Sequence, residues 1–373
     1  MNPIMNKSNL VMSELIRYSQ QIKMEEIGLA GQEKLKNSRV LCIGLGGLGS
    51  PLLVYLAAAG VGVLGIVDDD IIELSNLHRQ ILYNHTHINK KKVAAAKEQL
   101  LAINPLIQIE SYSRRLTEEN AAEIISQYDI IADGSDNFYT RYLIHSICFE
   151  LEKPYVYASA SHFQGYCSIF HGKQNPCFHC VFPISINDTN MPSCEGSGVI
   201  GTLPGLLGII QATEIIKWIL QIGNPLNKRL LAINLLTMTF KNIIISKNPD
   251  CEFCIQNQPI RKLINPMNCS TQIDSSHYRI TLDEFYKLYT NKNNIHLIDV
   301  RSIKEHQIQN VGGIVLPLDE LPQRLHELNP NQLIILYCQT GKRSKIALDI
   351  LLKSGFASVK YLENGLKGIT ADW

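Results

Sequence analysis

The sequence predicts an α/β protein with two domains: a larger one built on a doubly wound, mixed sheet, and a smaller α/β one. Between residue 39 and about residue 156, short apolar runs alternate with helical patterns, which is typical of parallel strands joined by crossover helices. Residues 256–277 are polar, lack periodicity and contain prolines, as linkers do. We therefore expect domains at residues 1–255 and 278–373, joined by this linker.

Each strand is predicted from a short run of branched or aromatic apolar residues. In the larger domain the expected strands are residues 39–43, 63–67, 107–111, 129–132, 155–160, 165–170, 230–233 and 238–245, with helices at 48–59 and 90–103. The strands after residue 154 follow one another closely, so we expect the sheet to become mixed there. In the smaller domain we expect strands at 295–300 and 333–337 and helices at 282–289 and 344–353.

Charge and apolar content exclude several classes of protein. The 373 residues carry 35 basic and 34 acidic side chains, a net charge of +1, so we expect binding to neither nucleic acid nor a membrane surface. The uncharged segment 196–213 contains Pro204 and several glycines and is followed by charged residues, so we expect a buried core helix rather than a membrane span. The first ten residues lack the apolar run of a signal peptide, which predicts a cytoplasmic protein.

A Gly-rich turn is expected to bind a nucleotide. Gly44, Gly46 and Gly49 fit the pattern G-x-G-x-x-G between a predicted strand and a predicted helix, and Gly47 adds a fourth glycine. The glycines permit a tight turn, and the helix N-terminus offers unpaired N–H groups to phosphate. Asp68 ends the next strand, where an acidic residue can bind ribose hydroxyls. Taken alone, this turn favours NAD.

Three charged residues favour a triphosphate instead. Arg79 and Lys92 follow the acidic strand end, and Asp136 lies at the end of a later strand, so all three are expected at the ligand-binding edge of the sheet. Two cations at one crevice suit a triphosphate, and a carboxylate suits the Mg²⁺ ion that accompanies it. These residues therefore predict Mg·ATP.

The ten cysteines fall into groups with different expected tasks. Cys177 and Cys180 form one C-x-x-C pair, and Cys251 and Cys254 form another, so four thiolates could hold a structural Zn²⁺ ion. His179, between two of these cysteines, is expected to be exposed rather than a ligand. Three cysteines in apolar elements are expected in the core: Cys42, Cys148 and Cys167.

Cys338 is the expected reactive thiol. It ends a predicted strand and begins the segment Cys338-Gln339-Thr340-Gly341-Lys342-Arg343-Ser344 before a predicted helix. Such a loop points backbone N–H groups inward beside a helix N-terminus and two cations, which stabilises a thiolate or a persulfide.

From about residue 13 to residue 254 the chain resembles the adenylating enzymes of molybdopterin and thiamine biosynthesis, relatives of the ubiquitin-activating enzymes, which have a Rossmann-like fold. The resemblance implies that Arg79 and Lys92 stabilise the phosphates of ATP, Asp136 holds Mg²⁺, Asp68 binds ribose and Asn76 lies near the reacting phosphate. Other predicted nucleotide-site residues in the same motifs are Asp70, Gln80 and Asn137. Cys194 matches a loop cysteine that some relatives use for covalent sulfur or thioester chemistry.

One motif departs from the family pattern. The family's Arg-Tyr-x-Arg-Gln appears as Arg17-Tyr18-Ser19-Gln20-Gln21, so Gln20 replaces an arginine that reaches the triphosphate in the dimer partner. A glutamine side chain supplies neither the positive charge of an arginine nor its planar pair of N–H donors. The resemblance implies a homodimer in which this contact is missing.

Residues 278–373 resemble the rhodanese homology domain. The matching positions are Asp299-Val300-Arg301, Glu305-His306, Gly312-Gly313, Pro317 and the loop that begins at Cys338. The resemblance implies that Cys338 accepts sulfur as a persulfide and that Arg343 helps to hold the anion.

These features predict an adenylyltransferase and sulfurtransferase. It would adenylate the C-terminal Gly of a small ubiquitin-like sulfur carrier ending in Gly-Gly, and Cys338 would then supply sulfur for a thiocarboxylate in molybdopterin or thiamine biosynthesis. The sulfur donor would be a cysteine desulfurase persulfide or thiosulfate. Three alternatives remain open: an NAD-dependent oxidoreductase fused to a sulfurtransferase, an activator of a ubiquitin-like conjugation pathway through a Cys194 thioester, and a non-catalytic carrier-binding scaffold.

Overall fold

The structure is a computed structural model, and it describes residues 9–183, 198–255, 277–290, 295–330 and 332–368. The chain divides into two compact units, residues 1–269 and residues 270–373, and each is described by itself. Residues 256–276, most of the predicted linker, lie outside the described residues, so the predicted domain boundaries stay a prediction.

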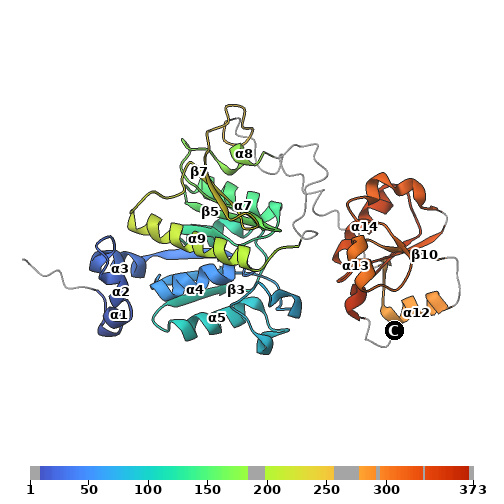
Figure 1. Cartoon of the computed structure of the whole chain (residues 1–373), viewed down its shortest axis with the longest axis horizontal. Helices are drawn as coiled ribbons and strands as arrows, with labels where there is room; N and C mark the ends of the chain where they lie inside the picture. The colour runs from blue at the N-terminus through green and yellow to red at the C-terminus, as the bar shows by residue number, and fades with distance from the viewer. Residues whose placement is uncertain (1–8, 184–197, 256–276, 291–294, 331, 369–373) are drawn as a thin grey trace, which may run out of the picture. The chain divides into compact units, whose positions relative to one another are not determined.

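The larger unit contains an eight-stranded mixed sheet (Figure 1). The strand order is β3-β2-β1-β4-β5-β6-β7-β8. The first five strands are parallel and the last three join by antiparallel pairing, which confirms the predicted doubly wound, mixed architecture. The strands are β1 (Arg39–Ile43), β2 (Val63–Val67), β3 (Gln108–Tyr112), β4 (Ile130–Asp133), β5 (Tyr155–Ser161), β6 (Gln164–Phe170), β7 (Arg229–Asn234) and β8 (Thr239–Ile244).

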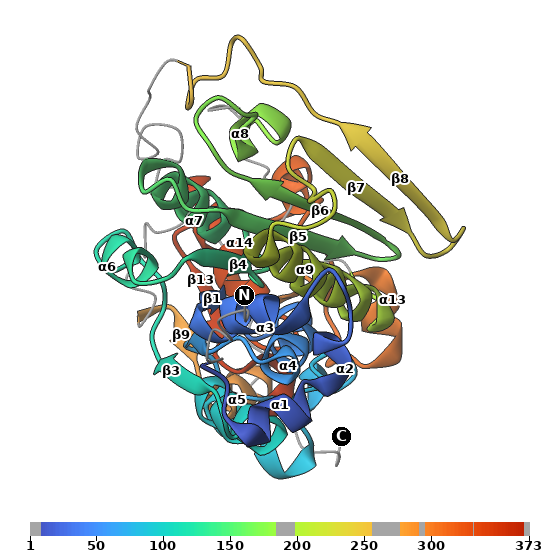
Figure 2. The same cartoon turned by 90° about the vertical axis from the view of Figure 1, so that its left-hand side faces the viewer.

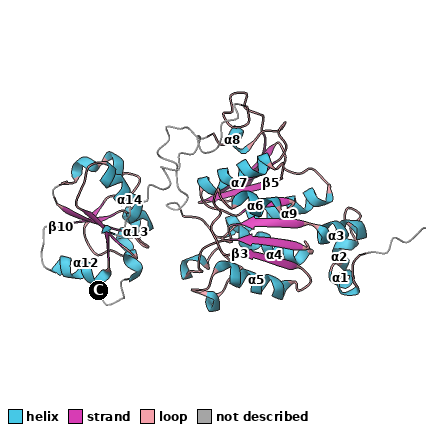
Figure 3. Cartoon of the chain, turned by 180° about the vertical axis from the view of Figure 1, so that it is seen from behind, coloured by secondary structure: helices cyan, strands magenta, loops and turns pink. Residues whose placement is uncertain are grey.

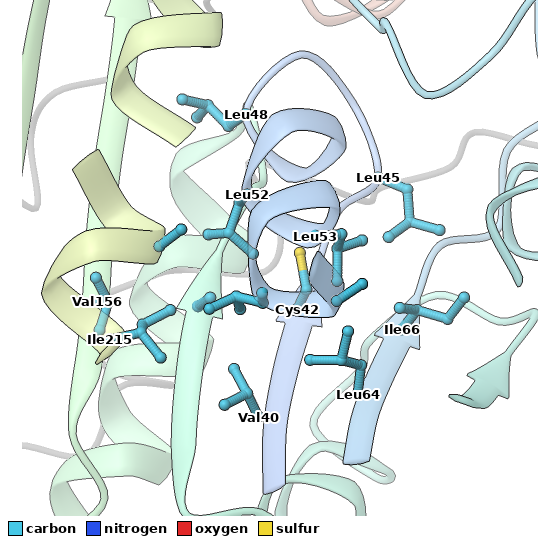
Figure 4. Close-up of a cluster of buried hydrophobic side chains, with 14 of the residues drawn as sticks. Val40, Cys42, Leu45, Leu48, Leu52, Leu53, Leu64, Ile66, Val156 and Ile215 are labelled. Carbon is cyan, nitrogen blue, oxygen red and sulfur yellow. The ribbon is translucent and has the colours of Figure 1, made fainter. Parts of the chain in front are cut away.

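Helices pack on both faces of this sheet, and each face has its own apolar core. One core joins the strands to α3 (Gly28–Asn37), α4 (Gly49–Ala59), α5 (Lys92–Ile103) and α9 (Thr202–Leu220), and Figure 4 shows its centre around Cys42 and Leu52. The other core joins the opposite strand face to α6 (Ala121–Ser126) and α7 (Phe138–Glu150), which are labelled in Figure 3. The described part of the unit also contains three short α-helices, α1 (Met12–Arg17), α2 (Ser19–Ile22) and α8 (Phe178–Val181).

Helix α9 is the one described helix that is long and apolar enough to cross a membrane. It packs instead on the sheet, where Leu203, Leu207 and Ile215 enter the core. The buried Gln211 donates through Nε2 to the carbonyl oxygens of Asp133, at 2.9 Å, and Val156, at 3.0 Å. A polar side chain that bonds to two strands suits a core helix and not a lipid-facing one, so the predicted core helix is confirmed.

Strands β7 and β8 lie at one end of the sheet, beyond α9 (Figure 2). Large apolar side chains are exposed on β8 and on the turn before it: Leu236, Met238, Phe240, Ile243 and Ile244. Exposed apolar side chains gathered in one segment are typical of protein–protein contacts.

The smaller unit is a five-stranded parallel sheet in the order β11-β10-β12-β13-β9. Side chains of α14 fill the core on one face, and α12 contributes Phe285 to a second core on the other. The strands are β9 (Arg279–Ile280), β10 (Ile295–Asp299), β11 (Ile314–Val315), β12 (Leu333–Tyr337) and β13 (Val359–Leu362), and the helices are α12 (Leu282–Thr290), α13 (Ile303–Ile308) and α14 (Lys342–Lys353).

Candidate active sites

The Gly-rich turn follows β1 and contacts the loop after β4 through backbone atoms. Gly44 has φ +92°, a left-handed conformation that glycine adopts without strain. A Cβ atom on Gly44 would lie 2.6 Å from the carbonyl oxygen of Gly134, and one on Gly49 would lie 2.1 Å from the oxygen of Gly44. The two loops therefore meet between β1 and β4, where the strand order reverses and where doubly wound sheets bind ligands.

We expect Gly49→Ala to lower the free energy of unfolding by about 3 kcal/mol, because the added methyl group overlaps a backbone oxygen. Gly46→Ala is the matched control, since the nearest atom to its Cβ would be Nε2 of Gln80 at 3.8 Å, an ordinary contact. Denaturant unfolding of both variants measures the difference. Equal stability would contradict the close backbone packing of Gly49.

Asp68 and Lys92 meet beside this turn. Oδ2 of Asp68 accepts a hydrogen bond from the backbone N–H of Leu45 at 2.8 Å and lies 3.9 Å from Nζ of Lys92. The buried Lys92 also donates to Oδ2 of Asp70 at 2.9 Å. Burial raises the pKa of the Asp68 carboxyl above its ordinary value, and the Lys92 ammonium opposes that rise. An ammonium held here can neutralise phosphate charge near the turn.

The loop after β2 brings Arg79 and Gln80 to the same turn. The side chain of Asn76 closes this loop, because its Oδ1 accepts from the backbone N–H of Glu73 at 3.0 Å. Arg79 is half-buried, and its Cγ lies 3.4 Å from the position of a Cβ on Gly47. Gln80 is buried, and among the described residues its Oε1 has no hydrogen-bond partner. The structure thus brings both predicted side chains to the glycines.

Asp136 and Asn137 lie at the end of β4, as predicted. Asp136 is exposed, so its carboxylate is open to a ligand. Asn137 caps α7, because its Oδ1 accepts from the backbone N–H of Thr140 at 2.9 Å. Asp133 fixes the loop by accepting from the N–H and Oγ of Ser135 at 2.8 and 2.6 Å.

A cavity of about 470 Å³ adjoins this loop, and sequence analysis did not anticipate it. Arg141, which is buried and donates to the carbonyl oxygen of Ser135 at 3.0 Å, connects the cavity to the loop. An arginine within the apolar helical pattern of residues 138–150 was the signal that could have indicated a site. The cavity is lined by Phe138, Arg141, Tyr157, Ser159, Ala160, Ser161, His162, Phe163, Gln164, Tyr166, Phe182, Asn234 and Leu236.

The two C-x-x-C pairs come together in one cluster. The sulfur atoms of Cys177 and Cys180 are 3.6 Å apart, those of Cys177 and Cys251 are 3.7 Å apart, and those of Cys180 and Cys254 are 3.6 Å apart. Four thiolates around a tetrahedral zinc ion, each about 2.3 Å from the metal, lie about 3.8 Å from one another. The residues therefore fit a closed zinc site.

The prediction for His179 is wrong, because this side chain is buried and only 5% exposed. Its ring stacks on Phe253, with ring centres 5.1 Å apart and an interplanar angle of 11°. Burial lowers the pKa of His179 to about 4, so the ring is neutral at physiological pH. Its place is in the aromatic packing beside the cysteine cluster.

Three of the remaining cysteines of the larger unit lie in the described part of the chain. Cys42, Cys148 and Cys167 are buried, which confirms the prediction that they belong to the core. Cys194 lies outside the described residues, so its predicted chemical role stays a prediction.

Cys338 ends β12 and opens a loop that leads into α14. Its side chain is buried. The segment after β13 fixes the start of the loop, because the backbone N–H of Leu366 donates to the carbonyl oxygen of Cys338 at 2.9 Å. Gly341 has φ +82° and lies against backbone atoms of Glu363, so a side chain there would clash. The loop therefore has a fixed shape at the N-terminus of a twelve-residue helix.

A buried ion pair supports this loop. Arg301 donates to both carboxylate oxygens of Asp299, and its Nη1 donates to Oε1 of Gln339, inside the loop, at 3.0 Å. His306 also contacts Asp299, at 2.9 Å through Nδ1. Burial favours the neutral acid, but hydrogen bonds from Arg301 and His306 outweigh it and hold the pKa of Asp299 below its ordinary value.

Arg343 forms a bidentate ion pair with Glu305. Nη2 lies 2.6 Å from Oε1 and Nη1 lies 2.9 Å from Oε2. Hydrogen bonding from Arg343 lowers the pKa of Glu305 to about 2. The predicted anion-holding arginine thus has both terminal nitrogens on a carboxylate.

Each of the two units matches a known family. The ThiF family model matches residues 18–253, and the rhodanese-like domain model matches residues 281–372. The chain belongs to the ThiF family. The ThiF domain holds the Gly-rich turn and the four-cysteine cluster, and the rhodanese-like domain holds Cys338.

Known relatives match either nearly the whole chain or about two thirds of it. A probable molybdopterin-synthase adenylyltransferase of Porphyra purpurea is 38% identical over 371 residues, which cover 97% of this chain and 93% of that protein. A probable adenylyltransferase/sulfurtransferase MoeZ of Mycobacterium tuberculosis is 35% identical over 366 residues, covering 96% and 93%. A sulfur carrier protein adenylyltransferase of Thermus thermophilus is 42% identical over 257 residues, covering 68% of this chain and 95% of that protein.

Solved structures share the fold of the ThiF domain. The crystal structure of Escherichia coli MccB with ATP has a TM-score of 0.56 and 21% identity, and the match covers 64% of this chain and 74% of that chain. At this identity the likeness concerns the fold alone.

These comparisons confirm the predicted family, fold class and enzyme class, an adenylyltransferase joined to a sulfurtransferase. Membership in an adenylyltransferase family implies ATP, which supports the interpretation drawn from Arg79, Lys92 and Asp136 over NAD. The roles of individual residues stay predictions.

Proposed function

We propose that this protein activates a small ubiquitin-like sulfur carrier in two steps, adenylation followed by sulfur transfer. The observation that carries the proposal is one chain with two sites, a phosphate-binding turn with Lys92 beside it and a buried cysteine on an anion-binding loop. The relatives' names, sulfur carrier protein adenylyltransferase and adenylyltransferase/sulfurtransferase, support both halves.

In the first step the carrier's C-terminal carboxylate attacks the α-phosphorus of ATP. A bond forms between the carboxylate oxygen and phosphorus, the bond to pyrophosphate breaks, and the product is an acyl-adenylate. A carboxylate is a weak nucleophile, so catalysis comes mainly from positioning and charge neutralisation. We assign neutralisation to Arg79 and Lys92, ribose binding to Asp68, and an Mg²⁺ ligand to the exposed carboxylate of Asp136.

In the second step the terminal sulfur of a Cys338 persulfide attacks the carbonyl carbon and expels AMP. The resulting acyl disulfide is cleaved by a second thiol, for which Cys194 is our candidate. This thiol bonds to the Cys338 sulfur and releases the carrier thiocarboxylate, and an external thiol then reduces the new disulfide.

Two surfaces of the ThiF domain suit such a carrier. The cavity of about 470 Å³ that Arg141 connects to the Asp136 loop can receive the narrow Gly-Gly tail of the carrier. The exposed apolar residues of β8 can receive the folded carrier. We place the molybdopterin-type carrier first, because the Porphyra relative covers almost the whole chain.

We also propose a homodimer, a structural Zn²⁺ ion and a cytoplasmic location. Exposed apolar side chains on α1 and just after α2, among them Met12, Ile16 and Met24, suit a subunit interface. Gln20 lies on α2 of the same region, so a dimer would lack the family's second arginine there. The spacing of the four sulfur atoms supports zinc.

The test mixes the protein with Mg·ATP, a sulfur donor and each candidate carrier, then measures ATP–pyrophosphate exchange and the intact mass of the carrier. We expect exchange with one Gly-Gly carrier, and replacement of one carrier oxygen by sulfur. A carrier lacking its terminal glycine is the control and should support neither reaction. The proposal is overturned if none of the carriers supports ATP–pyrophosphate exchange. A hydroxylamine-cleavable adduct on Cys194 without thiocarboxylate would indicate a conjugation pathway instead.

A further inference from the structure

The guanidinium of Arg343 already forms an ion pair inside the rhodanese-like domain. It is the second residue of α14, directly after the Cys338 loop, and its side chain is only 20% exposed. Both terminal nitrogens bond to Glu305, at 2.6 and 2.9 Å. A bidentate pair of this kind offsets most of the charge of the guanidinium and uses one N–H of each terminal nitrogen, so the group attracts a second anion less strongly.

Glu305 is also held in place by the residue that caps its own helix, α13. It is the third residue of α13, and its Oε2 accepts from the backbone N–H of Ser302 at 3.1 Å and from the Ser302 hydroxyl at 3.0 Å. This capping box fixes the carboxylate independently of Arg343. Glu305 is therefore a fixed negative charge opposite the arginine that follows the loop.

The second arginine near the loop is neutralised in the same way. Arg301, which donates to Gln339, is buried against the carboxylate of Asp299. Each of the two guanidinium groups next to Cys338 thus has its own carboxylate, and their charges cancel in pairs. With both guanidinium groups paired, the loop binds an anion through its backbone N–H groups and the single exposed ammonium of Lys342, a set that favours a small or singly charged sulfur species.

We propose that Glu305 makes the Cys338 site select a protein-bound persulfide over thiosulfate, by withholding Arg343 from the dianion. The inference rests on the proposed sulfurtransferase function and names its donor. Thiosulfate brings two negative charges to the loop, and an unpaired arginine would stabilise them. A persulfide on a donor protein brings at most one.

The transfer conserves atoms and electrons with either donor. The Cys338 thiolate attacks the terminal sulfur, a new S–S bond forms, and the bond between that sulfur and its previous partner breaks. The electron pair leaves with the donor, as a thiolate from a persulfide or as sulfite from thiosulfate. The donors differ in charge and leaving group, so a change of charge at Glu305 should act on one much more than on the other.

The test is Glu305→Gln in the full-length protein, because glutamine keeps the capping box and removes only the charge. The reduced protein is incubated with thiosulfate or with a persulfidated cysteine desulfurase, and persulfide on Cys338 is measured by intact mass without ATP or carrier. We expect the thiosulfate concentration for half-maximal loading to fall on the order of tenfold, with loading from the desulfurase changing less than about twofold. Glu327→Gln, which removes a carboxylate from an exposed pair with Arg324, is the matched control and should change neither.

The double variant Glu305→Gln/Arg343→Gln decides whether Arg343 carries the effect. We expect the gain with thiosulfate to disappear, because no cation is released. An unchanged thiosulfate dependence in Glu305→Gln, or a gain that survives in the double variant, would overturn the inference. If Glu305→Gln does not fold, Glu305→Asp, which shortens the carboxylate arm, must show a gain in the same direction. Absence of any persulfide on Cys338 in the parent protein would overturn the sulfurtransferase step itself, a result distinct from loading without selectivity.

Discussion

Cys338→Ser is expected to abolish thiocarboxylate formation, with a loss of about three orders of magnitude or more, while ATP–pyrophosphate exchange stays within about twofold. A hydroxyl group cannot hold a transferable sulfur atom, so the second step loses its nucleophile. The substitution changes one buried atom at the end of β12 and leaves the backbone contacts of the loop in place. Intact mass of the carrier and isotope exchange with labelled pyrophosphate measure the two steps separately.

The control for this experiment is Cys148→Ala. Cys148 is as deeply buried as Cys338 but lies on α7 and has no part in the proposed chemistry, so both steps should continue. Thiocarboxylate that still forms in Cys338→Ser would mean that sulfur enters through another thiol. Loss of exchange as well would show that adenylation depends on Cys338, against the two-step scheme.

Cys251→Ala is expected to destabilise the ThiF domain by about 5 kcal/mol or more and to release zinc, because structural zinc contributes directly to folding. Cys177 and Cys251 are 74 positions apart in sequence, and their sulfur atoms lie 3.7 Å apart, so the cluster joins the segment after β6 to the segment after β8. Phe149 and Phe253 pack against it, and their packing should loosen with it. Metal analysis and denaturant unfolding, with and without a chelator, measure the effect.

Cys148→Ala again provides the comparison. It removes a buried sulfur that belongs to no cluster, so we expect a cost of about 1–2 kcal/mol and an unchanged metal content. A protein that contains no zinc, or a Cys251→Ala variant as stable as Cys148→Ala, would contradict a structural metal site.

The sequence predicts the larger sheet well, because its strands are apolar runs bounded by glycine, proline and charged residues. The predicted strand 63–67 agrees with β2 at both ends, and 165–170 differs from β6 by one residue. The smaller sheet is different: β9 and β11 have two residues each, too few for any periodicity. They become strands only because β13 and β10 lie beside them.

Side-chain partners were harder to predict than the elements that carry them. The spacing of the C-x-x-C pairs indicates a cluster, but it says nothing of Phe253, which buries His179. The pair of Arg343 and Glu305 joins residues 38 positions apart, and it depends on how α13 and α14 approach each other. Such contacts follow from the tertiary arrangement, which no local pattern encodes.

The backbone contact among Gly44, Gly49 and Gly134 also limits how this sequence can evolve. At each of the three glycines, the backbone oxygen of another one occupies the place where a Cβ atom would lie. A single mutation to any other amino acid at these positions would therefore lower the stability of the protein. Gly46 has space around it, since the nearest atom to its Cβ would lie 3.8 Å away. We therefore expect related sequences to keep glycine at the positions of Gly44, Gly49 and Gly134 and to vary more often at that of Gly46.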